Sequence, residues 1–492
     1  MAELNVLTAL RVESIAFGGA DFVIGAGPER ARRAGTMLAS RLDEAAAVAL
    51  VGVAGALDSR LATGDIVVAS ELRTTDASYS RRLPAAPLLA AEFRRAKIAT
   101  RSGTLITSPH YVRAGERVTL AQSGALAVDM ESAWVMDQLP KNPTAVVRSI
   151  SDTSVTGPVR GGVRALGALS SMRGPLKSWA RACGSHEILL ASPRSFCAGV
   201  DRAIEIVERA LELFGTPVYV RRQIVHNVHV VRDLESKGAI FVEEVDEVPE
   251  NAVVVLAAHG VSPAVRDQAA ARRELNVIDA TCPLVSKVHS EARRFAAGGF
   301  DVVLIGHAEH EEVIGTVGEA PESIRVVRDV AEVEELALDP ERPVAFLTQT
   351  TLATDETDEI VAALRRRVPQ VASPPASDIC YATQNRQDAV RSIARRCDLL
   401  IVVGSANSSN TARLVEVAQR EGCRAELIED VSELELGWLA QARTIGLSAG
   451  ASVPDALVHE VLDSISALGP TKVSEERTAQ ETVRFALPSK VR

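Results

Sequence analysis

Three of the six cysteines stand where a thiol could do chemistry. Cys197 follows the apolar run 188–191, which predicts a buried strand, and precedes apolar residues at three- and four-residue steps, which predict a helix. Cys282 follows a similar strand over 276–280, and Cys380 is expected to follow a strand and open a further helix. Ligands of open α/β sheets bind beyond the carboxyl ends of strands, and amides at a helix start favour a thiolate. We therefore expect these widely and almost evenly spaced cysteines to converge on one centre.

The spacing of these thiols favours one kind of centre. A zinc site usually has a fourth ligand and closer pairs such as C-x-x-C. Three lone thiolates suit an iron–sulfur cluster with one iron left without a protein ligand, which could bind and help remove a substrate oxygen. Burial as inert hydrophobes is the common alternative, and we expect it for Cys397 and Cys423; Cys183 lies in a linker and is expected to be an ordinary thiol.

Polar side chains follow the other strands predicted in the same region, over 218–221, 253–258, 302–305, 344–347, 399–403 and 444–447. Imidazoles, hydroxyls and an amide at converging strand ends can donate hydrogen bonds to a diphosphate with little fixed positive charge, and helix amides add to them. The residues predicted for this role are His226, His259, His310, Ser408, Ser409, Asn410 and Ser452. Glu312 is the expected acid, because a carboxyl near an anion and away from water has a raised pKa and can hold a proton.

Length, net charge and cysteine content limit the classes of protein to which the chain can belong. A chain of 492 residues should hold roughly three domain-sized units. The net charge of −10 gives no general attraction for nucleic acid or anionic membranes. Six cysteines without close pairing fit a reducing cytoplasm better than a disulfide framework. The start lacks a secretion signal and no apolar run reaches the length of a membrane span, so we expect a cytoplasmic protein.

Strands alternate with helices along the chain, which predicts the α/β class. We expect a first α/β domain over 1–155, a final helix and linker over 156–186, and a larger α/β region over 187–470. The tail 471–492 is polar and of mixed charge, so we expect it to be mobile.

The first domain carries the segments AVDMESA, residues 127–133, and VRSISD, residues 147–152. With them it resembles the purine nucleoside phosphorylase and nucleosidase superfamily. The resemblance implies that Met130 and Glu131 bind a ribose and that Asp152 protonates a purine. It also matches Glu13 to an early glutamate of the family, and Gly25 and Gly55 to its phosphate-side glycines. A module kept for packing or assembly is the alternative.

The region 187–470 resembles the 4-hydroxy-3-methylbut-2-enyl diphosphate reductase family. The motifs that carry the resemblance are PRSFCAGVDRAI, VHN, AAHGVS, DATCPLVSKVH, GHAEHEEVIGTVG, TQTTL, DICYATQNRQ, VVGSANSSNTARL and SAGASVPD. The resemblance implies three α/β lobes in a trefoil around one [4Fe–4S] cluster per chain, held by Cys197, Cys282 and Cys380. It implies that His226, His259, Ser408, Ser409, Asn410 and Ser452 bind the diphosphate, and that His310, Glu312 and Thr350 deliver a proton.

The resemblance also implies a reaction. It is the reductive dehydroxylation of the allylic diphosphate to isopentenyl and dimethylallyl diphosphate, the last step of the methylerythritol phosphate pathway, with electrons from ferredoxin or flavodoxin. Two departures from the family stand out. Ser195 replaces a usual Gly, so its turn should avoid positive φ, and Glu311 replaces a usual Pro, which should loosen the loop bearing Glu312. A non-enzymatic iron–sulfur sensor and a main activity of purine nucleoside cleavage remain the alternatives.

Overall fold

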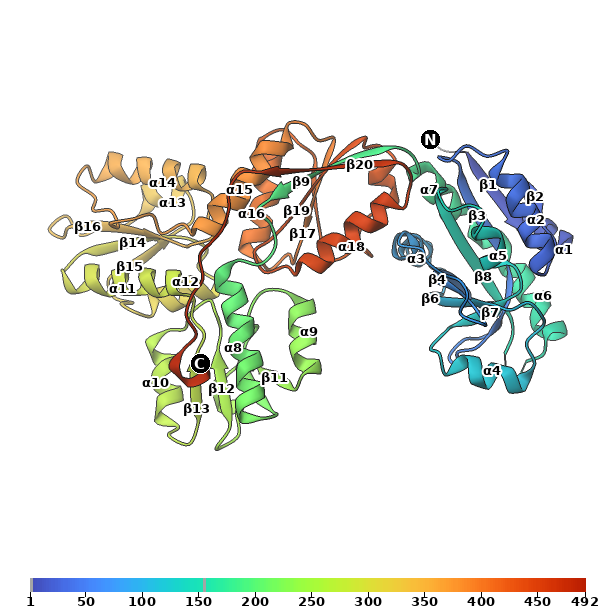
Figure 1. Ribbon diagram of the computed structural model, residues 1–492. Coiled ribbons are helices and arrows are strands. Elements are labelled where there is room, and N and C mark those ends of the chain that lie inside the picture. The colour runs from blue at the N-terminus through green and yellow to red at the C-terminus, as the bar shows by residue number, and fades with distance from the viewer. Residues whose placement is uncertain (1–2, 154–155) are drawn as a thin grey trace. The chain divides into compact units, whose positions relative to one another are not determined.

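The computed structural model describes residues 3–153 and 156–492, which form two compact units (Figure 1). The first unit is Met1–Ile188 with Asp430–Ile445 and His459–Ser474, and the second is Leu189–Glu429, Gly446–Val458 and Glu475–Arg492. Helices and parallel strands alternate in both, which confirms the predicted α/β class. None of the helices described is long and apolar enough to cross a membrane.

The first unit is built on one mixed sheet of eight strands. Their order is β2-β1-β3-β7-β6-β4-β5, and β8 pairs with β3 and β4. The strands are β1 (Leu4–Thr8), β2 (Phe22–Val23), β3 (Ala47–Ala56), β4 (Ile66–Thr74), β5 (Ser80–Arg82), β6 (Thr100–Thr107), β7 (Ala127–Asp129) and β8 (Thr144–Asp152). Nearly all of β3 is buried and its sequence is a continuous apolar run, whereas β8 is buried throughout yet carries polar residues, among them Arg148 and Asp152.

Seven helices accompany this sheet within the first part of the chain. They are α1 (Arg11–Phe17), α2 (Pro28–Ala39), α3 (Ala86–Arg95), α4 (Ala114–Ala121), α5 (Ser132–Met136), α6 (Pro158–Leu169) and α7 (Arg173–Ala182). The segment expected to hold one final helix and a linker instead forms two helices, joined by the 3₁₀ turn Ser170–Met172. Met172 is fully buried in that turn, and Pro175 fits the first turn of a new helix, so the second helix is favoured.

Three smaller sheets follow, and we name the parts of the fold built on them lobes A, B and C. Lobe A has the parallel order β11-β10-β12-β13, lobe B the parallel order β15-β14-β16, and lobe C the order β18-β17-β19-β9-β20. Lobe A contains β10 (Val218–Arg221), β11 (Ala239–Val242), β12 (Val253–Leu256) and β13 (Asn276–Asp279). Lobe B contains β14 (Asp301–Ile305), β15 (Ile324–Val327) and β16 (Val344–Thr348). Lobe C contains β9 (His186–Ser192), β17 (Leu399–Val403), β18 (Ala425–Ile428), β19 (Thr444–Ala449) and β20 (Thr471–Arg477).

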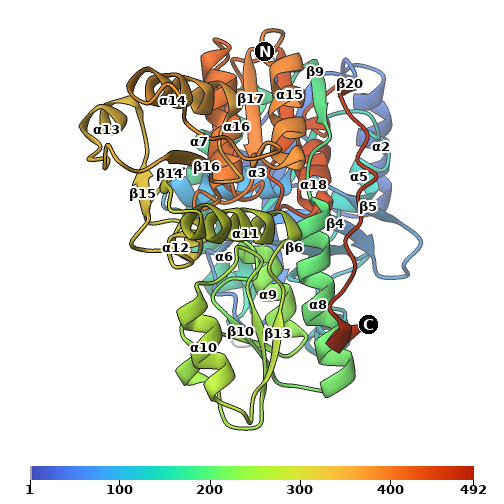
Figure 2. The same cartoon turned by 90° about the vertical axis from the view of Figure 1, so that its left-hand side faces the viewer.

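The helices from residue 198 onward connect and cover these sheets. They are α8 (Ala198–Phe214), α9 (Val228–Ser236), α10 (Pro263–Ala271), α11 (Pro283–Ala297), α12 (Glu311–Val317), α13 (Val330–Glu335), α14 (Thr354–Arg367), α15 (Tyr381–Ala394), α16 (Ser409–Arg420), α17 (Leu436–Leu439) and α18 (Asp455–Ser466). Three of them, α8, α11 and α15 (Figure 2), begin directly after Cys197, Cys282 and Cys380, each of which is the N-cap residue. The prediction that Cys380 follows a strand is wrong, because a loop precedes it after β16 and α14.

The C-terminal segment is ordered, so the prediction of a mobile tail is wrong. It begins with β20 at the edge of lobe C, and the amide of Thr478 then donates to the Ser192 carbonyl at 2.9 Å. It continues past α15 to α8 (Figures 1 and 2), where Leu487 packs on the lobe A core and Val491 is fully buried in it. Strand pairing, a few apolar anchors and single side-chain contacts hold this segment, and composition alone does not reveal them.

Candidate active site

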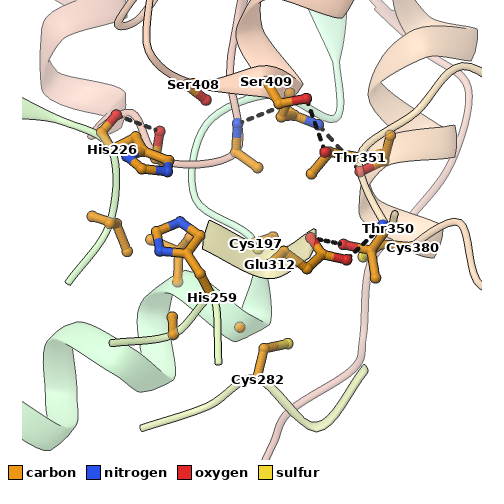
Figure 3. Close-up of a pocket in the computed structure, with 18 of the residues that line it drawn as sticks. Cys197, His226, His259, Cys282, Glu312, Thr350, Thr351, Cys380, Ser408 and Ser409 are labelled. Carbon is orange, nitrogen blue, oxygen red and sulfur yellow. Dashed lines mark hydrogen bonds between the residues drawn. The ribbon is translucent and has the colours of Figure 1, made fainter. Parts of the chain in front are cut away.

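One pocket in the second unit gathers all the residues that the sequence predicts for the larger region (Figure 3). They are Cys197, His226, His259, Cys282, His310, Glu312, Thr350, Cys380, Ser408, Ser409, Asn410 and Ser452. The polar residues follow β10, β12, β14, β16, β17 and β19 in turn. Strand ends of three lobes therefore meet at one place, as ligand sites of open α/β sheets do.

Backbone bonds fix each cysteine against a polar loop of the pocket. The Cys197 amide donates to the Ala451 carbonyl at 3.2 Å, beside Ser452, and the Cys282 amide donates to the Ala258 carbonyl at 2.9 Å. The Cys380 amide donates to the Thr350 carbonyl at 2.9 Å. Each cysteine that the sequence predicts as a cluster ligand is thus tied to a loop that also carries a residue predicted to bind substrate or deliver a proton.

The thiols are placed for a group that bridges the loops. A Cβ atom at Gly199 would lie 2.8 Å from the Cys282 sulfur and 3.7 Å from the Cys197 sulfur, so a side chain there would fill the space beside both. Burial raises the pKa of Cys282 to about 11 and that of Cys380 to about 12, although helix amides oppose the shift. The helix amides favour the thiolate, as expected, but desolvation has the larger effect on the pKa of these two thiols.

For these buried thiols to become thiolates, positive charge must lie beside them. No three His, Cys, Asp or Glu side chains in residues 3–153 and 156–492 are arranged to hold a single metal ion. Three converging thiols that open onto a shared pocket fit the iron–sulfur cluster inferred from the sequence, since a cluster spans more space than one ion and stabilises its thiolates.

Three imidazoles form one wall of the pocket. The rings of His226 and His259 are stacked with centroids 4.1 Å apart, and His310 meets them edge-on at 5.8 and 6.0 Å. Burial lowers the pKa of all three, that of His310 to about 4. Both ring nitrogens of His226 are buried and have no hydrogen-bond partner among the described residues, which is costly unless a ligand satisfies them.

His310 also serves as the N-cap of α12. Its Nδ1 accepts the amide of Glu312 at 3.2 Å. A neutral imidazole with an accepting Nδ1 carries its proton on Nε2, so the ring has one N–H left to donate to a ligand.

Glu312 is a buried carboxyl with only 3% of its surface exposed. Thr350 donates to both of its oxygens, from the amide to Oε1 at 2.7 Å and from Oγ1 to Oε2 at 3.0 Å. Burial raises the pKa of Glu312 to about 7 even though these bonds lower it. The carboxyl is therefore poised to hold and release a proton near neutral pH.

Hydroxyl and amide groups line the side of the pocket opposite Cys282 in Figure 3. The Asn410 side chain accepts the Ala451 amide at 3.0 Å and donates to Thr383 Oγ1 at 3.2 Å. The Ser452 hydroxyl donates to the His226 carbonyl at 3.1 Å. Polar atoms of three chain segments are thus fixed around one space.

Sequence reasoning missed several polar residues of this pocket. Thr351 lines it and donates to Ser409 Oγ at 3.0 Å, and Gln349 donates to Thr351 Oγ1 at 2.8 Å. The polar run TQTT after a buried strand was the available signal, but it did not single out a residue other than Thr350.

Ser195 and Glu311 are the two positions that depart from the family motifs, and the structure differs from the prediction at both. Ser195 has φ 62°, so the expectation that its turn avoids positive φ is wrong. Its hydroxyl donates to Asp455 at 3.1 Å and its carbonyl accepts Arg386 at 2.7 Å, and these bonds offset the backbone cost. Glu311 forms an ion pair with Arg222, which holds the first turn of α12 where a looser loop was expected.

The first unit holds a second cavity, of about 270 Å³, which brings together the predicted residues Glu13, Met130, Glu131 and Asp152. Glu13 accepts the amides of Val53 at 2.9 Å and Leu10 at 2.8 Å. Gly55 lines the cavity, whereas Gly25 does not border it.

A buried arginine organises the acids of this cavity. Arg148, fully shielded from solvent, lies 2.6 Å from Asp129 and 3.0 Å from Glu131. Burial raises the pKa of Glu131 although Arg148 opposes the shift. Gly52 lies opposite Arg148 in the register of β3 and β8, and a Cβ there would come within 2.6 Å of Glu13. Glycine at position 52 leaves the space in which Glu13 and Arg148 lie next to each other.

Sequence reasoning missed Arg117 and Tyr111 in this cavity. Arg117 forms an ion pair with Asp152, and a Cβ at Gly55 would lie 2.6 Å from its guanidinium. Tyr111 lines the same cavity with its ring 5.9 Å from the Arg117 guanidinium carbon. Neither residue lies in the two segments that carry the resemblance, so the sequence offered no signal for them.

Comparison with known proteins confirms both resemblances. The model of the phosphorylase superfamily matches residues 15–159, and that of the LytB protein family matches residues 188–466. The 4-hydroxy-3-methylbut-2-enyl diphosphate reductase of Cutibacterium acnes is 56% identical over 312 residues, 63% of this chain and 96% of that protein. The enzyme of the same name from Acidothermus cellulolyticus is 59% identical over 309 residues, 62% of this chain and 90% of that protein.

A solved structure agrees with these sequence relatives. The E-1-hydroxy-2-methyl-but-2-enyl-4-diphosphate reductase from Plasmodium falciparum is 38% identical, covers 63% of this chain and 97% of its own, and superposes with a TM-score of 0.60. Because the LytB match spans more than half of its length, with the pocket residues inside the matched range, the chain belongs to the LytB protein family.

Proposed function

We propose that the second unit removes the hydroxyl group of 4-hydroxy-3-methylbut-2-enyl diphosphate reductively, giving isopentenyl and dimethylallyl diphosphate. The observation that carries this proposal is one pocket with three thiols, three imidazoles of lowered pKa and a buried carboxyl of raised pKa. The named relatives are reductases of this substrate, and this chain spans nearly all of their length.

Cys197, Cys282 and Cys380 are the residues that would hold a [4Fe–4S] cluster, one per chain. When bound, the cluster supplies the electrons that cleave the carbon–oxygen bond, received from ferredoxin or flavodoxin. Each of the three cysteines stands at the N-terminus of a helix and lines the pocket together with residues of the polar loops.

The diphosphate end of the substrate would be bound by His226, His259, Ser408, Ser409, Asn410 and Ser452. Neutral imidazoles and hydroxyls donate hydrogen bonds to phosphoryl oxygens. A bound anion would also satisfy the His226 nitrogens that lack partners. Helix α16 begins at Ser409, so its first amides add donors at the same place.

Glu312 is the proposed proton donor. Its proton passes to the leaving hydroxyl, directly or through the Thr350 hydroxyl, so that the oxygen departs as water. His310 orients the hydroxyl end through the N–H at its Nε2. Two electrons and a second proton complete the reaction; we propose that a diphosphate hydroxyl gives this proton to either end of the allyl unit, which yields the two products.

Replacement of single cysteines tests the cluster assignment. Serine at Cys197, Cys282 or Cys380 should reduce the iron and sulfide that the purified chain retains after anaerobic reconstitution. Serine at Cys183 or Cys423 is the matched control, because both thiols are buried away from the pocket. Equal iron in all five variants would contradict the assignment.

A second candidate function belongs to the first unit, where one cavity joins the carboxyls of Glu13, Glu131 and Asp152. We propose that it binds a purine nucleoside, with Met130 and Glu131 at the ribose and Asp152 at the base. Cleavage requires that Asp152 exchange its Arg117 partner for the purine. Release of purine from nucleosides, measured with and without phosphate and lost in Asp152→Asn, would support this function; no release under either condition leaves binding or packing as the role.

A further inference from the structure

A cationic side chain of α8 reaches forward to the loop of the next cysteine. Arg202 lies five residues after Cys197, and its Nη1 donates to the carbonyls of Ala280 and Thr281, at 3.1 Å each. These two carbonyls directly precede Cys282. The helix that begins at the first cysteine therefore holds the chain that leads into the second.

The same arrangement recurs from the second cysteine to the third. Lys287 lies five residues after Cys282, on α11. Its ammonium group donates to the carbonyls of Ala376 at 2.9 Å and Ser377 at 3.0 Å, and to the Asp378 carboxylate at 2.9 Å. The Asp378 side chain is fully buried, and its other oxygen accepts the Thr348 amide at 3.2 Å, which ties the ion pair to the end of β16.

A side chain of the third helix contacts the loop that leads into the first cysteine. Arg386, six residues after Cys380 on α15, is fully shielded from solvent. It donates to the Ser195 carbonyl at 2.7 Å and to the Phe196 carbonyl at 3.0 Å, and these residues directly precede Cys197.

The C-terminal segment supports two of these cations. Glu481 accepts Arg386 at 2.9 Å, and the Ala486 carbonyl accepts Arg202 at 2.8 Å. The segment thus supplies the negative partner that a fully buried guanidinium requires.

We propose that Arg202, Lys287 and Arg386 form a cyclic brace that positions the three cysteines, each cation fixing the loop of the next cysteine along the cycle. They are positioning residues, since they act on the thiols through backbone carbonyls. The proposal rests on the proposed cluster at these cysteines. It adds the side chains that would hold the thiols of three lobes in position before the cluster binds. Lys287 pairs with Asp378, two residues before Cys380, so its positive charge favours the more negative, reduced state of a cluster held there.

Alkylation of the cluster-free protein tests the brace directly. Peptide mapping by mass spectrometry would follow the rate at which each cysteine reacts with iodoacetamide. Arg202→Gln should speed the reaction of Cys282 by about tenfold over the other two thiols, and Lys287→Met should do the same for Cys380. Arg209→Gln is the matched control, because Arg209 lies on the same helix as Arg202 and forms an ion pair with the exposed Glu212.

The pattern separates positioning from general loss of structure. Equal acceleration at all three cysteines, or none, would overturn the brace. Because Arg386→Ala could prevent folding, the two partly exposed cations carry the test, and Arg202→Lys should restore most of the wild-type protection at Cys282.

The reconstituted protein gives an independent reading. Lys287→Met should lower the midpoint potential of the cluster and speed iron loss to a chelator by about tenfold, while Arg209→Gln should change neither. Wild-type protein that takes up no cluster would refute the proposed function, and the alkylation pattern would still decide the brace. A wild-type potential in Lys287→Met, with a normal rate of iron loss, would contradict the brace alone.

Discussion

Thr350 donates two hydrogen bonds to Glu312, one to each carboxyl oxygen, at 2.7 and 3.0 Å. The pair joins the loop after β16 to the first turn of α12, and it leaves the carboxyl at the pocket wall with a fixed orientation (Figure 3). Burial raises the pKa of this carboxyl to about 7, so the same geometry that fixes its direction also lets it carry a proton.

Replacing Glu312 by Gln tests the proton donor. The amide keeps the size of the side chain but cannot release a proton at neutral pH, so kcat should fall by about 100-fold or more. Cluster absorbance and substrate binding should be retained. Glu309→Gln is the control, because Glu309 is an exposed carboxyl on the same loop. Unchanged turnover in Glu312→Gln would rule Glu312 out as the donor.

The pH dependence of turnover follows from the raised pKa of Glu312. The protonated acid is present below pH 7 and is lost as the pH rises through the folded-state value of about 7. Turnover should therefore fall above pH 7, approaching about tenfold per pH unit. The residual activity of Glu312→Gln should lack this limb. A limb of the same midpoint in the variant would assign it to another group.

Changes at the diphosphate site distinguish an enzyme from a sensor. His259→Phe keeps a ring in the stack but removes the hydrogen bonds of the imidazole, so KM should rise by about tenfold to 100-fold. Ser408→Ala should act in the same direction. Ser236→Ala, at the exposed end of α9, should behave like the wild type. A sensor without a substrate predicts normal cluster behaviour and no dependence on either pocket residue.

The positive φ of Ser195 predicts an order of stabilities. Ser195→Ala loses the bond to Asp455 and keeps the backbone cost, whereas Ser195→Gly loses the bond but relieves that cost. The glycine variant should be more stable than the alanine variant by about 1 kcal/mol. Urea unfolding of the cluster-free variants would measure this difference, and a more stable alanine variant would contradict the assigned backbone strain.

The site was predictable because short apolar strands are visible in the sequence and parallel strands bring their carboxyl ends together. His226 and His259 follow strands of lobe A and Glu312 follows a strand of lobe B, so the place of each near a strand end was predictable, whereas their convergence depends on how the two sheets are arranged. The helix after Cys197 was predictable because apolar residues recur at helical steps after it, but the exact cap positions of the three cysteines were not predicted.

Features that depend on long-range partners were not predictable. Ser195 adopts positive φ where Arg386 and Asp455, far along the chain, hold its polar groups. The C-terminal segment looked mobile because its anchors, such as Glu481 to Arg386, are single contacts in a polar sequence. Arg117 lies in the first unit's cavity because it forms an ion pair with Asp152, and no local sequence pattern indicates this pair. The raised thiol pKa values likewise come from burial, which a cap position does not show.

The central claim is best tested by one anaerobic experiment. The purified chain would be reconstituted with iron and sulfide, reduced with a chemical donor, and given 4-hydroxy-3-methylbut-2-enyl diphosphate. The account predicts a broad iron–sulfur absorbance and the release of isopentenyl and dimethylallyl diphosphate, both lost in Cys197→Ser. A cluster without product would contradict the proposed reaction, and the absence of a cluster while Cys197, Cys282 and Cys380 stay free to alkylate would contradict the assignment of the site itself.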